Sequence, residues 1–451
     1  MKREGDPVRA VIVTIGNEIL SGDTLDTNSA FLAQELNALG VRVSARHTVP
    51  DDAAAIAGAI RLGLGEAGLV ITTGGLGPTR DDITLDAVAA EFSQNLVVDP
   101  EQARRVREVF ARRAIEMPAI NESQFRRMEG AVIVYNPSGT APGQLVAVGG
   151  GHVCLLPGVP REVRELWGAG IREAVRALTD TPLARLKRTV RTVGVSESVL
   201  SQRLEDAGMP GKLDEAGIAL AFLPRHGLVD LRLTRFLTGE NPSAEERFAQ
   251  LVKGIEAAVG GCVYGRDSDT LSGAVGARLR ELGLSLGTAE SCTGGGIGDW
   301  LTDVPGSSDY YVGGVIAYSN AIKIKLLCVP NAILERHGAV SRETAAAMAL
   351  GALDALGCDV ALSTTGVAGP GGGSAEKPVG TVFVGLAQHP RTLDDWPPER
   401  GRLLGDLQRT QTHEGPHFLF TRQLKLTGDR DLVRRRTVIH ALDTLRRRLA
   451  D

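Results

Sequence analysis

The chain has 451 residues, a formal net charge of −4, 43% apolar residues and 23% charged residues. A chain of this length exceeds what one hydrophobic core usually organises, so several domains are expected. The ordinary globular composition excludes disorder of the whole chain. Because basic and acidic residues are interspersed, no broad cationic surface suits a phosphate backbone, and direct nucleic-acid binding is not expected.

A cytoplasmic location without a membrane partner is expected. No stretch approaches the roughly 20 apolar residues of a membrane-spanning helix, and the polar start MKREGDPVRA is followed by no apolar signal segment. The five cysteines are odd in number and lack CxxC spacing, which fits a reducing compartment and argues against structural zinc.

The N-terminal part alternates short apolar runs with segments of helical period. Strands are predicted at 8–16, 41–49 and 69–75, and helices at 28–40 and 53–68. This alternation is typical of an α/β domain with a parallel sheet. The β-rich stretch 131–156 closes the domain, and a helical segment leads out of it.

Two further units follow. Residues 188–260 read as strand, helix, strand, strand, helix, which predicts a small α+β module. The last unit opens with a helix at 271–283, continues with strands at 284–290, 310–319, 359–367 and 379–387, and ends with a helix at 431–449. The Pro-, Arg- and Asp-rich segment from Gln388 to Pro416 predicts a surface insertion.

A glycine-rich motif, ITTGGLGPTRDDIT, follows the third N-terminal strand directly. Ligands bind at the carboxyl ends of strands in open α/β sheets, and the glycines Gly74, Gly75 and Gly77 let the backbone approach an anionic group closely. Asp81 and Asp82 add hard oxygen ligands suited to a divalent ion on phosphates. No Gly-Lys-Ser/Thr follows, so the motif is no Walker loop.

The alternative for this motif is a tight turn in which an aspartate caps a helix. Two more glycine-containing loops follow strands, at Gly16–Gly22 and Gly139–Gly143. Convergence of three such loops on one cleft favours a ligand site.

Ser291 follows the strand 284–290 in the sequence SCTGG, where the next helix N-terminus would stabilise developing negative charge. No His–Asp pair accompanies this serine, so Lys323 is the available base. A lysine desolvated against apolar strands has a lowered pKa and can be neutral near physiological pH. Tyr318 could relay the proton or orient the lysine, and Thr365 ends a third strand.

Purely structural interpretations stay open here. Ser291 could be an N-cap, Lys323 a solvated helix residue and Thr365 a turn residue. Cys292 is a rival nucleophile, although it lacks an evident histidine partner.

Arg430 and Arg434 lie one helical turn apart, so both could face one phosphate. The glycine-rich loop 369–373 could close over the ribose phosphate. The alternative for the arginines is a solvated basic helix face.

Several sequence blocks, in order, resemble the CinA family. GNEILSGDTLDTNSAFLAQEL, TTGGLGPTRDDIT, SGTAPG and LPGVPREV, within 8–170, resemble its molybdopterin-binding-like domain, a Rossmannoid fold of the MogA/MoaB type. GVSESVLSQRLEDAG and LVDLRLTRF resemble its KH-like linking domain. TAESCTGG, AYSNAIK, TTGVAGPGGG, EKPVGTV and GDRDLVRRRT, within 269–449, resemble its nicotinamide-nucleotide amidase domain.

The resemblance implies an α/β protein with domains at 1–178, 179–266 and 267–451. A nucleic-acid-binding KH fold presents a GXXG loop, and none is expected between the helices of the middle module. A structural or dimer-bridging role is therefore expected there. Family members are often dimers, so a homodimer is predicted.

For the C-terminal domain, the resemblance implies hydrolysis of nicotinamide mononucleotide to nicotinate mononucleotide and ammonia, without a metal. Ser291 becomes the nucleophile and Lys323 the base, with Tyr318 and Thr365 in support. The substrate-binding residues are then Thr293, Gly294, Gly366, Gly369, Gly371, Gly372, Arg430 and Arg434.

For the N-terminal domain, the resemblance implies hydrolysis of ADP-ribose that depends on a divalent metal ion (Mg, Mn or Co). Asp81 and Asp82 become the metal ligands. The nucleotide site comprises Glu18, Asp26, Asn28, Gly74, Gly75, Gly77 and Gly139. Two alternatives are molybdopterin-type ligand binding and a non-enzymatic role in DNA uptake or damage.

Overall fold

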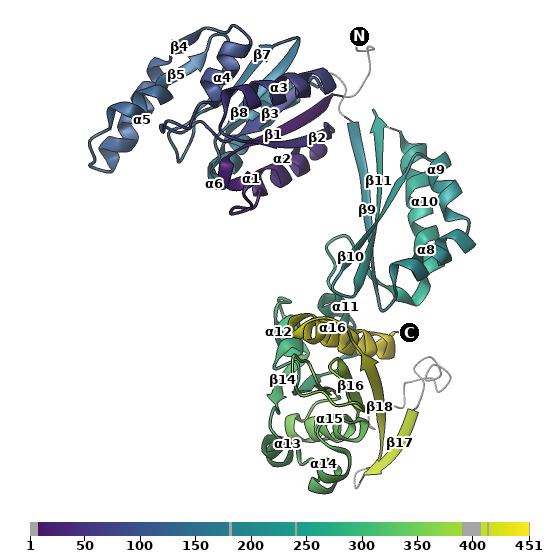
Figure 1. Cartoon of the computed structure of the whole chain (residues 1–451). Coiled ribbons are helices and arrows are strands. Elements are labelled where there is room, and N and C mark those ends of the chain that lie inside the picture. Colours follow the sequence, from purple (N-terminus) through teal and green to yellow (C-terminus); the bar gives the residue numbers. More distant parts are fainter. Residues whose placement is uncertain (1–7, 180–182, 240, 390–406, 413–414, 451) are drawn as a thin grey trace. The chain divides into compact units, whose positions relative to one another are not determined.

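The structure is a computed structural model that describes residues 8–179, 183–239, 241–389, 407–412 and 415–450 (Figure 1). It divides into two compact units, residues 1–186 with 235–243 and residues 187–234 with 244–451. The expected α/β class is confirmed in both large domains.

The N-terminal domain is built on a six-stranded sheet of order β2-β1-β3-β8-β7-β6. The first four strands run parallel, β7 is antiparallel to β8, and β6 is antiparallel to β7. The strands are β1 (Arg9–Ile15), β2 (Arg42–Val49), β3 (Leu69–Thr73), β6 (Val132–Val134), β7 (Gly143–Val148) and β8 (Gly151–Leu156).

Alternate side chains of β1 pack against helices on opposite faces of this sheet. Val11 and Val13 lie in the cluster with α3 and α4, and Ala10 and Ile12 lie in the cluster with α2 and α6. Such alternation follows from the two-residue period of a strand. The helices are α1 (Asn17–Leu20), α2 (Thr27–Ala38), α3 (Ala53–Glu66), α4 (Thr84–Glu91), α6 (Pro160–Leu166), η2 (Trp167–Ile171) and α7 (Arg172–Arg176).

The segment between α4 and β6 forms a small substructure of its own that was not predicted from the sequence. Asp99 caps its main helix by accepting a hydrogen bond from the Gln102 backbone N–H at 2.8 Å. A small separate core of Ala103, Val106 and Phe125 holds it together. Its elements are β4 (Leu96–Val98), α5 (Pro100–Arg112), η1 (Ala119–Phe125) and β5 (Arg126–Met128).

The middle module has the predicted α+β pattern, with one more strand and one more helix. Its sheet has the order β10-β11-β9-β12. The elements are β9 (Leu183–Val193), α8 (Glu197–Asp206), α9 (Met209–Glu215), β10 (Ala219–Arg225), β11 (Leu228–Thr238), α10 (Pro242–Val259), η3 (Gly260–Cys262) and β12 (Val263–Arg266).

This module does contain a Gly-X-X-Gly run, which was not expected. The second helix, α9, was missed in the sequence; Ala207 and Gly208 join it to α8, and the run Gly208-Met209-Pro210-Gly211 extends from this turn into the first turn of α9. Met209 is buried. Of the exposed charged side chains around it, Glu205, Asp206, Asp214 and Glu215 are acidic, whereas Arg203 and Lys212 are basic. These acidic side chains repel a phosphate backbone, so the loop alone does not favour nucleic-acid binding.

The C-terminal domain also has a six-stranded sheet, of order β14-β13-β15-β16-β18-β17. The strands β14, β13 and β15 run parallel to one another. The remaining neighbouring pairs, β15–β16, β16–β18 and β18–β17, are antiparallel. They span β13 (Leu286–Glu290), β14 (Tyr311–Ile316), β15 (Val360–Gly366), β16 (Thr381–Gln388), β17 (Leu407–Thr412) and β18 (Gly415–Lys425).

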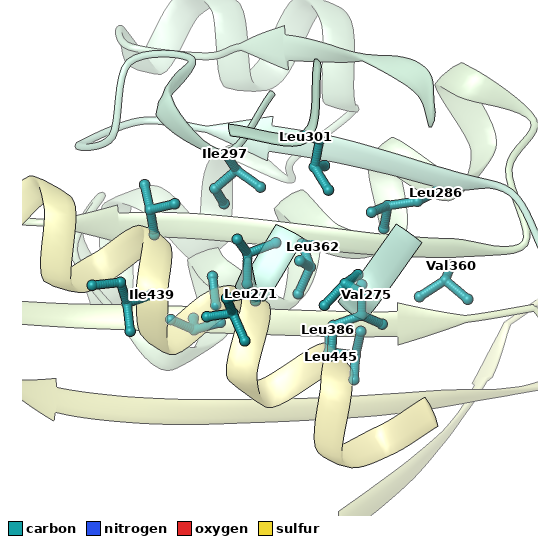
Figure 2. Close-up of a cluster of buried hydrophobic side chains, with 14 of the residues drawn as sticks. Leu271, Val275, Leu286, Ile297, Leu301, Val360, Leu362, Leu386, Ile439 and Leu445 are labelled. Atoms are coloured by element: carbon teal, nitrogen blue, oxygen red, sulfur yellow. The ribbon is translucent and has the colours of Figure 1, made fainter. Parts of the chain in front are cut away.

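Helices cover both faces of this sheet. Leu362 and Leu386 from the strands meet Val275 of α11 and Ile439 of α16 in one core (Figure 2), while α15 packs on the opposite face. The helices are α11 (Leu271–Leu282), α12 (Gly296–Thr302), η4 (Ser307–Asp309), α13 (Asn320–Leu327), α14 (Asn331–His337), α15 (Arg342–Leu356) and α16 (Arg430–Leu449).

The interpretation of 388–416 as a surface insertion is wrong for its C-terminal part. Residues 407–412 form β17, which pairs with β18, and β18 itself begins at Gly415. Neither strand was predicted from the sequence. Residues 390–406 and 413–414 lie outside the described residues. No helix within the described part of the chain combines the length and the apolarity needed to span a bilayer.

A substitution at Gly74 tests the tight turn that ends β3. Gly74 has a φ of +107°, and a Cβ atom there would lie 2.2 Å from the Ile15 carbonyl oxygen. We expect Gly74→Ala to destabilise the N-terminal domain by about 1–3 kcal/mol. Calorimetry of the unfolding transitions measures the change. The control is Gly65→Ala in α3, where a Cβ meets nothing within 4 Å and alanine stabilises a helix by about 0.5–1 kcal/mol. Equal transitions for the two variants would contradict the prediction.

Candidate active sites

The N-terminal domain has a cavity of about 510 Å³ at the carboxyl ends of β1, β3 and β8. Residues from all three predicted loops line it, represented by Gly16, Gly74 and Thr140. The predicted convergence of the loops on one cleft is therefore found. The remaining lining includes five carboxylates and no lysine or arginine: Glu18, Asp51, Asp81, Asp82 and Glu162.

The two predicted metal ligands differ in how their oxygens are used. Asp82 accepts hydrogen bonds from the backbone N–H groups of Gly77, at 2.7 Å, and Thr79, at 2.8 Å. Asp81 accepts one hydrogen bond, from the Thr79 hydroxyl, which lowers the pKa of the Asp81 carboxyl. Asp82 therefore holds the glycine loop together, while Asp81 keeps an oxygen for a ligand.

Two predicted nucleotide-site residues, Asp26 and Asn28, do not line the cavity. Asp26 caps α2 by accepting from the Ser29 backbone N–H at 2.9 Å, and it also accepts from the Thr14 hydroxyl. Asn28 is buried and donates to the Gly158 carbonyl oxygen at 2.7 Å. Both residues position neighbouring loops rather than face a ligand, because their polar groups are already used within the domain.

The predicted residue Gly139 lies behind the cavity wall. A Cβ at this position would come within 2.4 Å of the Glu162 carboxyl group. Glu162, which sequence reasoning missed, is the residue that lines the cavity there. Its only sequence signal is its place in the block LPGVPREV.

The C-terminal site lies at the carboxyl ends of β13, β14 and β15. Ser291 follows β13 directly, and Lys323 is on the first turn of α13. The Lys323 Nζ atom donates to Ser291 Oγ at 3.2 Å and to the carbonyl oxygens of Ala317 and Tyr318 at 2.7 and 3.1 Å. Both side chains line a cavity of about 280 Å³.

Lys323 is only 1% exposed, so the interpretation as a solvated helix residue is wrong. Burial lowers the pKa of its ammonium group, because water no longer stabilises the charged form. The rival nucleophile Cys292 is also buried, and burial raises the pKa of its thiol to about 12. The thiolate of Cys292 is therefore scarce at neutral pH.

The two supporting residues act through different groups, Tyr318 through its backbone carbonyl and Thr365 through its side-chain hydroxyl. Tyr318 orients Lys323 through its carbonyl oxygen, whereas its side chain is 65% exposed and its hydroxyl has no hydrogen-bond partner among the described residues. The expected proton relay through this hydroxyl is thus not formed. Thr365 is buried, and its hydroxyl donates to the Ala339 carbonyl oxygen at 2.6 Å, which fixes one wall of the cavity.

The two predicted phosphate-binding arginines take different positions. Arg430 lines the cavity and donates to the Gly369 carbonyl oxygen at 2.7 Å. Arg434 instead donates to the Thr293 carbonyl oxygen at 2.8 Å and is not part of the lining. The expectation that both face one phosphate is wrong, since the Arg434 guanidinium holds the turn after Ser291. The cavity lining also includes Gly366, Gly369, Gly371 and Gly372.

Glu290 is a residue that sequence reasoning missed. Its side chain is buried, and its two carboxylate oxygens accept hydrogen bonds from the backbone N–H groups of Ile297 and Gly298, each at 3.0 Å. These groups form the N-terminus of α12, which was expected to stabilise developing negative charge. That expectation is wrong, because Glu290 already occupies these donors. No histidine or metal spacing marks this residue in the sequence.

No group of three or more His, Cys, Asp or Glu side chains that could hold a metal ion occurs in the described residues. The carboxylates of the N-terminal cavity therefore form no cage of their own. Asp81, which keeps an oxygen for a ligand, fits a magnesium-type ion, because such an ion commonly takes one or two carboxylates and completes its coordination with substrate phosphates and water.

The two α/β domains, one with a serine–lysine pair and one with converging glycine loops, define a multidomain protein with two separate candidate sites. Three family models match the chain in order. They are described as "Probable molybdopterin binding domain" for residues 11–177, "Damage-inducible protein CinA KH domain" for 187–265 and "CinA C-terminal domain" for 268–395. The predicted fold of each domain is thereby confirmed.

Named relatives agree with these matches. A CinA-like protein of Gemmatimonas aurantiaca is 43% identical over 381 residues, which cover 83% of this chain and 87% of the relative. A CinA-like protein of Chloroherpeton thalassium is 41% identical over 386 residues, covering 84% and 90%. The chain therefore belongs to the CinA family.

Among solved structures, the protein CinA of Thermoplasma acidophilum, described as of unknown function, shares 34% identity. That match covers 37% of this chain and 98% of the other, with a TM-score of 0.34.

Removal of the Glu290 carboxylate tests its role at α12. We expect Glu290→Ala to leave the Ile297 and Gly298 N–H groups without partners, at a cost of about 1–3 kcal/mol each. Chemical denaturation of the C-terminal domain measures the loss. The control is Glu281→Ala on α11, whose carboxylate is 68% exposed and whose loss changes stability by no more than about 0.5 kcal/mol. Similar losses in the two variants would contradict the assignment.

Proposed function

We propose that the C-terminal site hydrolyses the carboxamide of nicotinamide mononucleotide to nicotinate mononucleotide and ammonia. The observation that carries this proposal is the burial of Lys323 with its Nζ atom 3.2 Å from Ser291 Oγ. A neutral amine has two N–H donors and one lone pair. With the carbonyl oxygens of Ala317 and Tyr318 accepting from the two donors, the lone pair is left for the Ser291 hydroxyl proton.

The serine attacks the carboxamide carbon while Lys323 takes the hydroxyl proton. The tetrahedral intermediate then expels ammonia, which receives a proton from Lys323, and an ester between Ser291 and the nicotinate group remains. Water attacks this ester with Lys323 again as the base, the ester C–O bond breaks, and the proton returns to Ser291. One amide and one water give one acid and one ammonia.

The cavity lining also offers groups that can bind the phosphate and the rest of the substrate. Arg430 is the one cationic lining residue besides Lys323 in the described part of the site, and it suits the substrate phosphate. The loop 366–372 contributes backbone groups along the same wall. Because Glu290 takes the α12 amides, donors for the developing oxyanion have to come from backbone groups nearer the cavity.

Ammonia release from nicotinamide mononucleotide, measured without added metal, tests the proposal. We expect Ser291→Ala to abolish it and Lys323→Ala to lower it by about 10²–10⁴-fold, as for loss of a general base. Cys292→Ala is the matched control, since its thiol is not used. Its activity should stay near the wild type.

The same assay separates the other roles. The wild-type rate should rise with pH as Lys323 loses its proton and level off below the ordinary lysine pKa of 10.5. Tyr318→Phe should retain most activity, because the tyrosine acts through its carbonyl. No ammonia from the folded wild type, or full activity in Ser291→Ala, would overturn the proposal.

A second function is favoured by the N-terminal cavity. We propose that this site hydrolyses the pyrophosphate of ADP-ribose to AMP and ribose 5-phosphate, with a divalent ion. Backbone groups of the glycine loop and Asp81 line one cavity, which suits a phosphate pair held jointly with a metal ion. The ion would neutralise phosphate charge when bound. Both substrates would then be products of NAD breakdown.

Metal dependence distinguishes the two sites. Chelation with EDTA should abolish AMP release from ADP-ribose and leave ammonia release from nicotinamide mononucleotide unchanged. Asp81→Asn should weaken the first activity only. Chromatography of both product pairs from one sample measures this. Tight binding of a pterin ligand without any AMP release would favour molybdopterin-type binding instead.

The homodimer, the cytoplasmic location and the absence of direct nucleic-acid binding stay predictions. So does the alternative of a non-enzymatic role in DNA uptake or damage.

A further inference from the structure

Glu162 has a distinct position in the N-terminal cavity. It lies on the first turn of α6 and lines the cavity together with Pro157, Gly158 and Val159. This segment approaches the glycine loop closely, because a Cβ built on Gly158 would lie 3.5 Å from the Gly74 Cα atom. The carboxylate therefore belongs to the same cavity as the proposed phosphate site but comes from another segment.

A side-chain amide fixes this carboxylate. Asn136 Nδ2 donates to Glu162 Oε2 at 2.7 Å and to the Ala141 carbonyl oxygen at 2.9 Å. Asn136 Oδ1 in turn accepts from the backbone N–H groups of Ser138 and Gly139. The loop 136–141 thus holds one Glu162 oxygen, and Oε1 has no partner among the described residues.

The other carboxylates of the cavity differ from Glu162. Asp82 is used in the glycine loop, Asp51 accepts from the Asn17 N–H at 3.0 Å, and Glu18 and Asp81 are exposed. Glu162 is half-buried without a cationic partner in the described residues. Burial raises the pKa of its carboxyl, which the Asn136 hydrogen bond partly opposes. A raised pKa strengthens a carboxylate as a base.

The charged groups around Glu162 also differ from it in their surroundings. Those facing the cavity from the other segments are the acidic Glu18, Asp51, Asp81 and Asp82. On its own helix, Glu165 lies one turn away, and a hydrogen bond from Ser138 together with the ion pair with Arg161 at 2.8 Å lowers the pKa of its carboxyl. The pKa values of the two glutamates on this short helix are therefore shifted in opposite directions, and Glu162, which has no ion pair in the described residues, faces the cavity.

We propose that Glu162 is the general base that activates the attacking water in pyrophosphate hydrolysis at the N-terminal site. The proposal rests on the hydrolytic function proposed above for that site. The water oxygen forms a bond to one phosphorus as its proton passes to Glu162 Oε1. The bond from that phosphorus to the bridging oxygen breaks, and the electron pair stays on the leaving phosphate. Glu162 then returns the proton to solvent.

The test is the pH dependence of AMP release from ADP-ribose at saturating Mg²⁺. We expect the wild-type rate to fall as pH decreases through the Glu162 pKa, because the protonated carboxyl accepts no proton. Glu162→Gln should lower the rate by about 10²–10⁴-fold and remove this acid limb. Glu162→Asp keeps a carboxylate and should retain the limb at a reduced rate. The control, Glu173→Gln on α7, where the carboxylate is 69% exposed, should stay within about two-fold of the wild type.

Two further measurements make every outcome decisive. Thermal unfolding shows whether Glu162→Gln is folded, and the Glu162→Asp profile carries the test if it is not. Binding of Mn²⁺, followed by electron paramagnetic resonance, should be unchanged in Glu162→Gln, since a loss would make Glu162 a metal ligand and overturn its role as base. An active Glu162→Gln with the acid limb intact would overturn this inference alone. A wild type that hydrolyses no pyrophosphate would overturn the proposed function and this inference with it.

Discussion

Both candidate sites depend on one constraint, which is that neighbouring parallel strands end at the same edge of a sheet. In the N-terminal domain β1, β3 and β8 bring three loops to one cavity, and in the C-terminal domain β13, β14 and β15 do the same. The loops have to pass close to one another there. At Gly74, only a residue without a Cβ avoids the Ile15 carbonyl.

The buried and half-buried polar groups near these edges fall into two kinds. Glu290, Asp82 and Asp26 accept hydrogen bonds from backbone N–H groups and thereby fix turns. Lys323 is instead held by two backbone carbonyl oxygens beside Ser291 Oγ, and Glu162 is held through one carboxylate oxygen. Burial lowers the pKa of Lys323 and raises that of Glu162, so the neutral form of each is favoured. A group that is fixed in place and has a shifted pKa is suited to moving a proton. Two different reactions can therefore take place at the ends of parallel strands in two similar six-stranded sheets.

The sequence predicted much of this fold because apolar periodicity was strong in the buried strands and helices. It failed for the strands β17 and β18 and for the short helix α9. Among the site residues, Ser291 and Lys323 meet as expected, since they follow the neighbouring parallel strands β13 and β14, which end at the same edge of the sheet. Arg434, Asp26 and Asn28 were misplaced because a residue near a site in sequence can point its polar group into the protein instead.

The sequence by itself determined the family, the order of the domains and the strand ends at which reactive residues stand. Those features follow from patterns along the chain, where each residue's neighbours are known. Only the tertiary structure decided that Lys323 is desolvated, that Glu290 takes the α12 amides and that Glu162 faces the N-terminal cavity. Burial and hydrogen-bond partners depend on segments far apart in the chain, as in the contact of Asn136 with Glu162, and no local pattern contains them.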